Sequence, residues 1–286
     1  MIRSMTGFGR SEYETPEVTI SVEIRALNSK NLELNLRIPY NYRVWEEEVR
    51  AAVKPQLLRG KVDINLHIKH HGLAAASELN KEVITAYIQQ LGEIAHATPA
   101  ELLPIATRLP DALQSAETSP DEKQKKEVFG LVNEAIENLV NYQKTEGQAM
   151  ATDLSNQIEN IGQGLHDVDT KKGKRLEQVR SKLQENLKTL AIDVDSNRFE
   201  QELIFYLEKL DINEEIVRLG QHLSYFREVM ENDAIAKGKK LGFIAQEMGR
   251  EINTIGSKAN DAAMQKEIVR MKDALERIKE QLLNVL

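Results

Sequence analysis

The feature that most constrains the fold of this chain is a change in the period of its apolar residues near Asn80. Before that point apolar and polar residues alternate, which is the pattern of β-strands with one buried face. The alternating stretches are Ile20 to Ala26, Leu32 to Ile38 and Val62 to Ile68. After it apolar residues recur every three or four positions, as they do along amphipathic helices. The chain is therefore predicted to join a small sheet to a helical region.

The predicted fold class is α+β. Residues 44–58 show helical spacing between the second and third alternating stretches, and Gly60 suits the C-cap of that helix. We expect a small, mostly antiparallel N-terminal sheet with helices on one side, then a long helical arm and an all-α C-terminal domain. The predicted domains are residues 1–150, 151–195 and 196–286.

The arm is predicted from two runs of apolar residues at coiled-coil spacing. These are Leu154, Ile158, Ile161, Leu165 and Val168, followed by Leu176, Val179, Leu183, Leu187 and Leu190. A third stripe, from Ile268 to Leu282, lies near the C-terminus. Together they offer more apolar positions than one domain needs, so we expect a homo-oligomer.

Composition excludes several classes of protein. The chain has no cysteine, which rules out disulfides, cysteine-ligated zinc and thiol nucleophiles. Its 38 basic residues against 45 acidic residues give a net charge of -7, so a nucleic-acid site would have to be a local basic surface. It shows neither a signal-peptide core nor a run of about 20 apolar residues. We expect a cytoplasmic protein without a membrane partner.

Two C-terminal helical segments each carry a polar stripe one residue before an apolar stripe. One residue turns a helix by about 100°, so each polar stripe lies at the edge of its apolar face. The short MENDAIAKG connection favours an antiparallel hairpin, in which both polar edges meet in one groove. The apolar positions are Ile212, Ile216, Leu219, Leu223 and Phe226 in the first segment, and Leu241, Met248, Ile252 and Ile255 in the second.

The predicted groove has the chemistry of a divalent-metal site. Carboxylates and imidazole are ligands for Mg²⁺, Mn²⁺ and Zn²⁺. The predicted ligands are Asp211, Glu215, His222, Glu247 and Glu251. The alternative is a salt-bridge network, because Arg218 and Arg250 can pair with the same acids. The pattern alone leaves both open.

Several stretches resemble the YicC/YloC-like endoribonuclease family along essentially the full length. They are IRSMTGFGR, VEIRALNSKNLEL, LLRGKV, TEG, RFEQELIFYLEKLDINEEIVRLGQH and GKKLGFIAQEMGREINTIGSKAND. The resemblance implies a bacterial, metal-dependent endoribonuclease that assembles as a hexamer and cuts single-stranded or small structured RNA in RNA turnover. The chain departs from the family pattern at Gly242 and Gly249, where the family commonly has an acid and an asparagine.

Our leading hypothesis is hydrolysis of RNA phosphodiester bonds with a divalent cation, Mn²⁺ or Mg²⁺, with Zn²⁺ as an alternative. The ion would polarise phosphate and activate water, while basic side chains offset the growing negative charge. The expected catalytic residues are His222, Glu247, Arg218, Arg250 and Lys258. A metal-free route, in which His222 is the general base on the 2′-hydroxyl, is also open. The rival classes are a non-catalytic RNA-binding adaptor and a structural helical assembly protein.

Basic residues are predicted to contact RNA phosphates from strand faces, turns and the start of a helix. The predicted set is Arg3, Arg10, Arg25, Lys30, Arg37, Arg59, Lys61, Lys239 and Lys240. The alternative is a mixed-charge solvent or subunit face, which would also include Glu23, Glu33 and Asp63.

Overall fold

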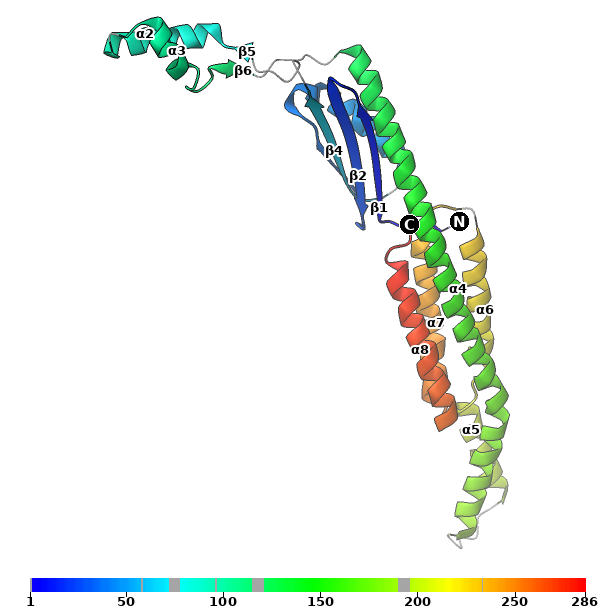
Figure 1. The fold of residues 1–286 in the computed structure, drawn as a ribbon. Helices are drawn as coiled ribbons and strands as arrows, with labels where there is room; N and C mark the ends of the chain where they lie inside the picture. The colour runs from blue at the N-terminus through cyan, green and yellow to red at the C-terminus, as the bar shows by residue number, and fades with distance from the viewer. Residues whose placement is uncertain are drawn as a thin grey trace. The chain divides into compact units, whose positions relative to one another are not determined.

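The computed structural model describes residues 2–57, 59–71, 78–95, 97–114, 121–189, 196–232 and 234–286. It divides into two compact units, Gly7–Asn141 and Met1–Thr6 with Tyr142–Leu286. The long helix α4, Glu122–Thr189, contributes to both units. The predicted α+β class is confirmed, because a small N-terminal sheet is followed by helices (Figure 1).

The unit Gly7–Asn141 is built on a four-stranded sheet in the order β1-β2-β4-β3. β2 is antiparallel to both β1 and β4, whereas β3 is parallel to β4, so the sheet is mostly antiparallel as predicted. The elements of this unit before α4 are β1 Gly7–Glu14, β2 Val18–Leu27, β3 Leu32–Arg37, α1 Glu46–Val53, β4 Gly60–His70, β5 Glu78–Leu79, α2 Lys81–Ala95, α3 Pro99–Ala106 and β6 Leu113–Gln114.

Alternation fixes which face of this sheet is buried. The even-numbered side chains from Ile20 to Ala26 in β2 and from Val62 to Leu66 in β4 are buried, and they pack with Trp45, Val49 and Ile136 from the helical segments. The odd-numbered side chains of these strands lie on the outer face. The apolar alternation therefore predicted the three expected strands correctly. It did not single out β1, β5 or β6.

Gly60 differs from its predicted role. The helical stretch ends as a short 3-10 turn, Lys54–Gln56, and Gly60 is instead the first residue of β4. Its φ of 119° lies in the region that favours glycine, and a Cβ there would come within 2.9 Å of the Leu27 carbonyl oxygen. Gly60 therefore begins a strand and does not cap a helix, so the C-cap prediction is wrong.

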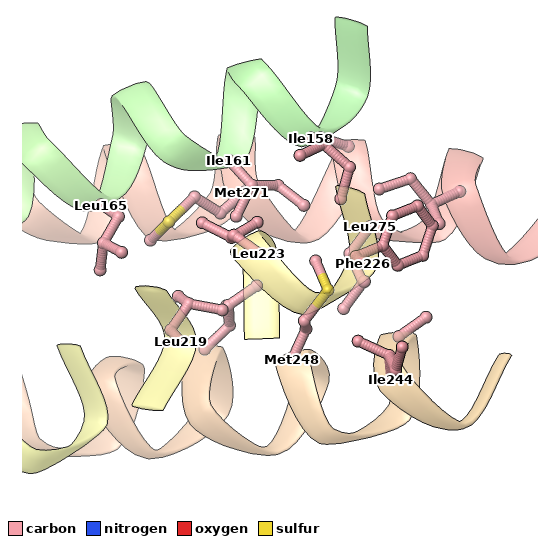
Figure 2. Close-up of a cluster of buried hydrophobic side chains, with 14 of the residues drawn as sticks. Ile158, Ile161, Leu165, Leu219, Leu223, Phe226, Ile244, Met248, Met271 and Leu275 are labelled. Atoms are coloured by element: carbon pink, nitrogen blue, oxygen red, sulfur yellow. The ribbon is translucent and has the colours of Figure 1, made fainter. Parts of the chain in front are cut away.

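The second unit is a helical bundle in which four helices surround one apolar core. Figure 2 shows Ile158 and Leu165 of α4 gathered in that core with Leu223 of α6, Met248 of α7 and Met271 of α8. The remaining bounds are α5 Ser196–Lys209, α6 Asn213–Glu231, α7 Gly238–Lys258 and α8 Ala262–Leu282. Among the described residues, no helix is long and apolar enough to cross a bilayer.

The first run of the predicted arm belongs to this core. Leu154, Ile158, Ile161 and Val168 are each fully buried, and Leu165 is nearly so. These apolar side chains are therefore buried by other residues of the same chain. Of the second run, Val179 is half-buried, while the side chains of Leu176, Leu183, Leu187 and Leu190 lie outside the described part.

Candidate active site

The helices α6 and α7 form a hairpin whose connection is held by a buried ammonium group. Lys237 is 2% exposed, and its Nζ donates hydrogen bonds to the carbonyl oxygens of Met230, at 2.7 Å, and of Asn232. A cation at the last carbonyls of a helix satisfies groups that have no partner within it. The backbone N–H groups of Lys237 and Gly238 both donate to Leu286, at 2.9 Å each. The turn is thus fixed on both sides.

The predicted apolar stripes of this hairpin are confirmed. Ile212, Leu219, Leu223 and Phe226 are buried on one segment, with Ile216 partly buried, and Leu241, Met248, Ile252 and Ile255 are all fully buried on the other. The two stripes meet in the bundle core, and this apolar contact positions the polar edges beside them.

Two contacts join the polar edges of the helices. The Lys258 Nζ, at the end of α7, donates to Glu215 Oε1, near the start of α6, at 2.8 Å. Towards the other end, the Lys240 Nζ lies 4.8 Å from the centre of the Tyr225 ring. Early residues of one helix pair with late residues of the other, so the hairpin is antiparallel. We call this edge the α6–α7 seam, formed by Glu215, His222 and Tyr225 of α6 with Lys240, Glu247, Glu251 and Lys258 of α7.

His222, Glu247 and Glu251 occupy the middle of the seam. His222 follows Glu215 by seven residues, which is about two turns, and Glu251 precedes Lys258 by the same interval. Each therefore shares a helix face with one partner of the ion pair. All three side chains are partly exposed. An imidazole from one helix and two carboxylates from the other are consequently open to a solvent-borne ligand.

Glu215 is the most buried acid of the seam. The residue is 7% exposed, and its Oε2 atom is buried without a hydrogen-bond partner among the described residues. Leaving a buried acceptor unpaired costs about 1 to 3 kcal/mol. The carboxylate thus depends on Lys258, whose side chain is 32% exposed, for its neutralisation.

The two arginines form ion pairs within their own helices. Arg250 forms an ion pair with Glu247, with 2.8 Å between Nη1 and Oε1 and side chains 75% and 42% exposed. Arg218 pairs with Glu214, one turn earlier in α6. The salt-bridge alternative is therefore realised for Glu247, whereas Arg218 pairs with an acid that we did not predict. Exposed pairs of this kind contribute about 0 to 1 kcal/mol.

The five predicted metal ligands do not form one cluster in this chain. Among the described residues, no three histidine, aspartate or glutamate side chains are close enough to hold a metal ion together. Asp211 Oδ1 accepts hydrogen bonds from the backbone and side-chain amides of Asn213, at 3.1 and 2.7 Å, at the start of α6. Glu215 is engaged by Lys258. Helical spacing placed these acids on one edge but spread them along its length.

Four of the predicted RNA-contacting residues lie on the outer face of the sheet. These are Arg10, Arg25, Arg37 and Lys61, which alternate with buried or partly buried neighbours along the sheet. Arg10 is paired with Glu12 at 2.8 Å and Arg25 with Glu23 at 3.4 Å, as in the mixed-charge alternative. Arg37 and Lys61 line a hollow of about 470 Å³ beside the edge strand β3.

The other predicted basic residues are spread over both units. Lys30 is exposed in the turn after β2, and Arg59 is half-buried just before β4. Arg3 belongs to the helical unit, where its carbonyl oxygen accepts a hydrogen bond from the Leu286 N–H at 3.0 Å. Lys239 and Lys240 are exposed in the first turn of α7.

Our sequence reasoning missed two aromatic residues next to these lysines. Tyr225 is 40% exposed, and Phe243 is 57% exposed with the Lys239 Nζ 5.9 Å from its ring centre. Phe243 belongs to a stretch that carries the family resemblance, and Tyr225 follows another such stretch by three residues. The sequence could have revealed them, because each is an aromatic residue at the polar edge of an amphipathic helix. A side chain at that edge is not needed to fill the buried core.

Two of the resemblance motifs are explained by packing in the helical unit. The Thr6 hydroxyl, in SMTG, donates to Glu146, in TEG, at 3.0 Å. A Cβ on Gly147 would lie 2.2 Å from the Ile2 carbonyl oxygen, so only glycine fits there. The Ser4 N–H also bonds the Gln143 carbonyl oxygen at 3.0 Å. These motifs fasten the N-terminal segment to α4.

Most of the chain matches known proteins in sequence. Residues 2–152 match the model for the YicC-like endoribonuclease N-terminal region, and residues 168–286 match the model for the C-terminal region. A probable endoribonuclease YicC of Clostridioides difficile is 30% identical, and one of Haemophilus influenzae is 28% identical, each over 100% of both chains. The chain belongs to the YicC-like endoribonuclease family.

Proposed function

We propose that this protein is an endoribonuclease and that it cuts RNA at the α6–α7 seam. The observation that carries the proposal is the seam itself, where a solvent-open imidazole and two carboxylates lie between two lysine contacts on a packed hairpin. A preorganised set of acid, base and cationic groups is what phosphodiester cleavage requires. The names of the two relatives, both probable endoribonucleases, support the same reaction class.

The roles follow from the chemistry of each group. His222 can accept the proton of the attacking hydroxyl or donate one to the leaving oxygen. Lys258 and Arg250 supply positive charge against the negative charge that grows on the phosphate in the transition state. We assign Arg218, which is exposed on α6, to neutralising an adjacent phosphate of the RNA in exchange for its pairing with Glu214. We expect single-stranded or small structured RNA to fit an open edge of this kind.

Metal dependence is part of the proposal, with a smaller ligand set than the sequence predicts. Mg²⁺ and Mn²⁺ bind through oxygen ligands, and Mg²⁺ is usually held by one or two carboxylates plus substrate phosphates and water. Glu247 and Glu251, partly exposed and one turn apart on α7, suit such a site. A bound ion would supply a Lewis acid for the phosphate and lower the pKa of water.

We also propose a homo-oligomer, a hexamer by resemblance. Ile204, Phe205 and Tyr206 of α5 are 46% to 56% exposed, and a run of exposed apolar side chains is typical of a protein interface. Sedimentation at micromolar concentration tests this, and a monomer would refute it.

The decisive test of function is to incubate purified protein with end-labelled RNA, with and without a chelator. Cleavage that stops with chelator and returns with Mn²⁺ supports the metal-dependent nuclease. Cleavage that persists, with cyclic or 3′-phosphate ends, favours His222 acting as general base without an ion. Binding without cleavage indicates an adaptor, and no interaction with RNA indicates a structural assembly protein.

A further inference from the structure

We infer that Tyr225 and Phe243 are stacking platforms that hold unpaired RNA bases beside the α6–α7 seam. This inference rests on the proposed function, because it assigns the part of the substrate that the seam recognises. It predicts a preference for single-stranded nucleotides over duplex RNA.

Exposure is the first argument. Phe243 is 57% exposed and Tyr225 is 40% exposed, although the buried stripes of α6 and α7 already fill the core between them. Neither ring is therefore needed for packing. A large aromatic surface left open beside reactive groups is available to a ligand.

Position is the second argument. Tyr225 follows His222 by three residues, which is about 5 Å along the helix axis. Phe243 precedes Glu247 by four residues, which is one turn of α7. Both rings thus lie one turn from the proposed catalytic groups, on the side of the hairpin connection. That connection is fixed by the buried Lys237, so the rings are presented on a rigid support and little ordering is needed on binding.

Charge complementarity decides the kind of ligand. Each ring has a lysine ammonium beside it, Lys240 for Tyr225 and Lys239 for Phe243. Proteins that bind single strands combine a ring for each base with a cation for the backbone. Lysine is depleted in protein–protein interfaces, so this pairing fits RNA better than a second copy of the chain. Paired bases have both faces covered by their neighbours, so only unpaired nucleotides can use the rings.

The test uses a single-stranded RNA carrying 2-aminopurine, a fluorescent base that is quenched when it stacks. Tyr225→Leu and Phe243→Leu remove a ring while keeping apolar bulk, whereas Tyr225→Phe and Phe243→Tyr keep the ring. Tyr40→Leu is the matched control, because Tyr40 is 81% exposed and also has a cation, Arg43, 5.5 Å from its ring centre, but lies in the other unit.

We expect each leucine variant to bind about tenfold more weakly, within the range for loss of one base–ring stack, and to lose part of the quenching. The ring-keeping variants and Tyr40→Leu should match the wild type. The slope of affinity against salt should be unchanged by ring removal but reduced by about 0.7 in Lys240→Gln. Annealing the RNA to its complement should weaken wild-type binding and abolish the difference between variants.

The outcomes separate this inference from the proposed function. Leucine variants that bind and quench as the wild type does, while RNA is still cut, overturn the inference and leave the nuclease standing. Ring-dependent binding without cleavage supports the inference and refutes the nuclease. A wild type that does not bind RNA refutes both. A leucine variant with altered sedimentation and unchanged quenching assigns the rings to an interface between copies and overturns the inference.

Discussion

The α6–α7 seam and the outer face of the β-sheet both pair acids with bases, but they do so at different depths. On the sheet, Arg10 and Glu12 pair at 2.8 Å with side chains 49% and 43% exposed. In the seam, Glu215 and Lys258 pair at the same distance with side chains 9% and 32% exposed. The first pair remains largely hydrated. In the second pair the Glu215 carboxylate has lost most of its hydration, so close contact with Lys258 must offset the desolvation cost.

The two regions have similar charge patterns but differ in burial. Burial is therefore the property that distinguishes a candidate site from a solvated face. The sheet face neutralises Arg10 and Arg25 with its own acids and costs little to rearrange. The seam holds a carboxylate, one of whose oxygens has no hydrogen-bond partner in the described part of the chain, in place through apolar packing behind it. If the comparison is right, disturbing the packing should have the largest effect on the fold, and the sheet charges the smallest.

The largest effect is expected from a charge placed behind the seam. Met248→Asp puts an unpaired carboxylate at a position that is fully buried in the bundle core, so it should cost several kcal/mol and unfold the helical unit. Val269→Asp is the control, because Val269 of α8 is 55% exposed. Urea denaturation followed by circular dichroism measures both, and equal stability of the two variants would contradict a packed seam.

The next effect concerns the two ion pairs that involve α7. Lys258→Met keeps the aliphatic stem but leaves the buried Glu215 carboxylate without its cation, so we expect a loss of about 1 to 3 kcal/mol. Arg250→Met removes the exposed partner of Glu247 and should change stability by less than about 0.5 kcal/mol. The midpoints of urea unfolding compare them. A similar loss of unfolding free energy in both variants would show that burial does not distinguish the two ion pairs.

A smaller effect is expected at the two glycines that depart from the family pattern. Nothing would contact a Cβ at Gly242, so Gly242→Ala should stabilise the helix by about 0.5 to 1 kcal/mol. A Cβ at Gly249 would lie 3.2 Å from the Leu275 Cδ2 atom, so Gly249→Ala should gain less. Thermal unfolding checks the order. A larger gain for Gly249→Ala would contradict the close approach of α7 and α8.

The smallest effect is expected on the sheet. Arg37→Ala with Lys61→Ala removes two exposed cations beside the β3 hollow, which should weaken RNA binding a few-fold and reduce its salt slope by about 0.7 for each phosphate that is no longer neutralised. Arg10→Ala, at a position already paired with Glu12, should change binding less. Affinity measured at several salt concentrations tests this. An unchanged slope in the double variant would remove the sheet from the RNA-binding surface.

The sequence predicted the parts of this molecule that follow from periodicity. Alternation identified β2, β3 and β4, and the one-residue offset of the stripes placed polar edges together along α6 and α7. Periodicity assigns a face but not a position along it, so it grouped Asp211 and Glu215 with Glu247 although they lie turns apart. The Leu27 carbonyl beside Gly60 and the Leu286 carbonyl that accepts from the Lys237 N–H both come from distant backbone, and no local pattern reveals such contacts.

Cleavage by variants of the seam that keep the fold tests the central claim most directly. His222→Ala and Glu247→Gln change partly exposed residues, so both proteins should keep the wild-type melting temperature and oligomeric state. If the seam is the RNA-cleaving site, the single-turnover cleavage rate of each should fall by about 100-fold or more, as expected when a general acid–base group or a metal ligand is lost. Wild-type cleavage rates in both folded variants would contradict the assignment.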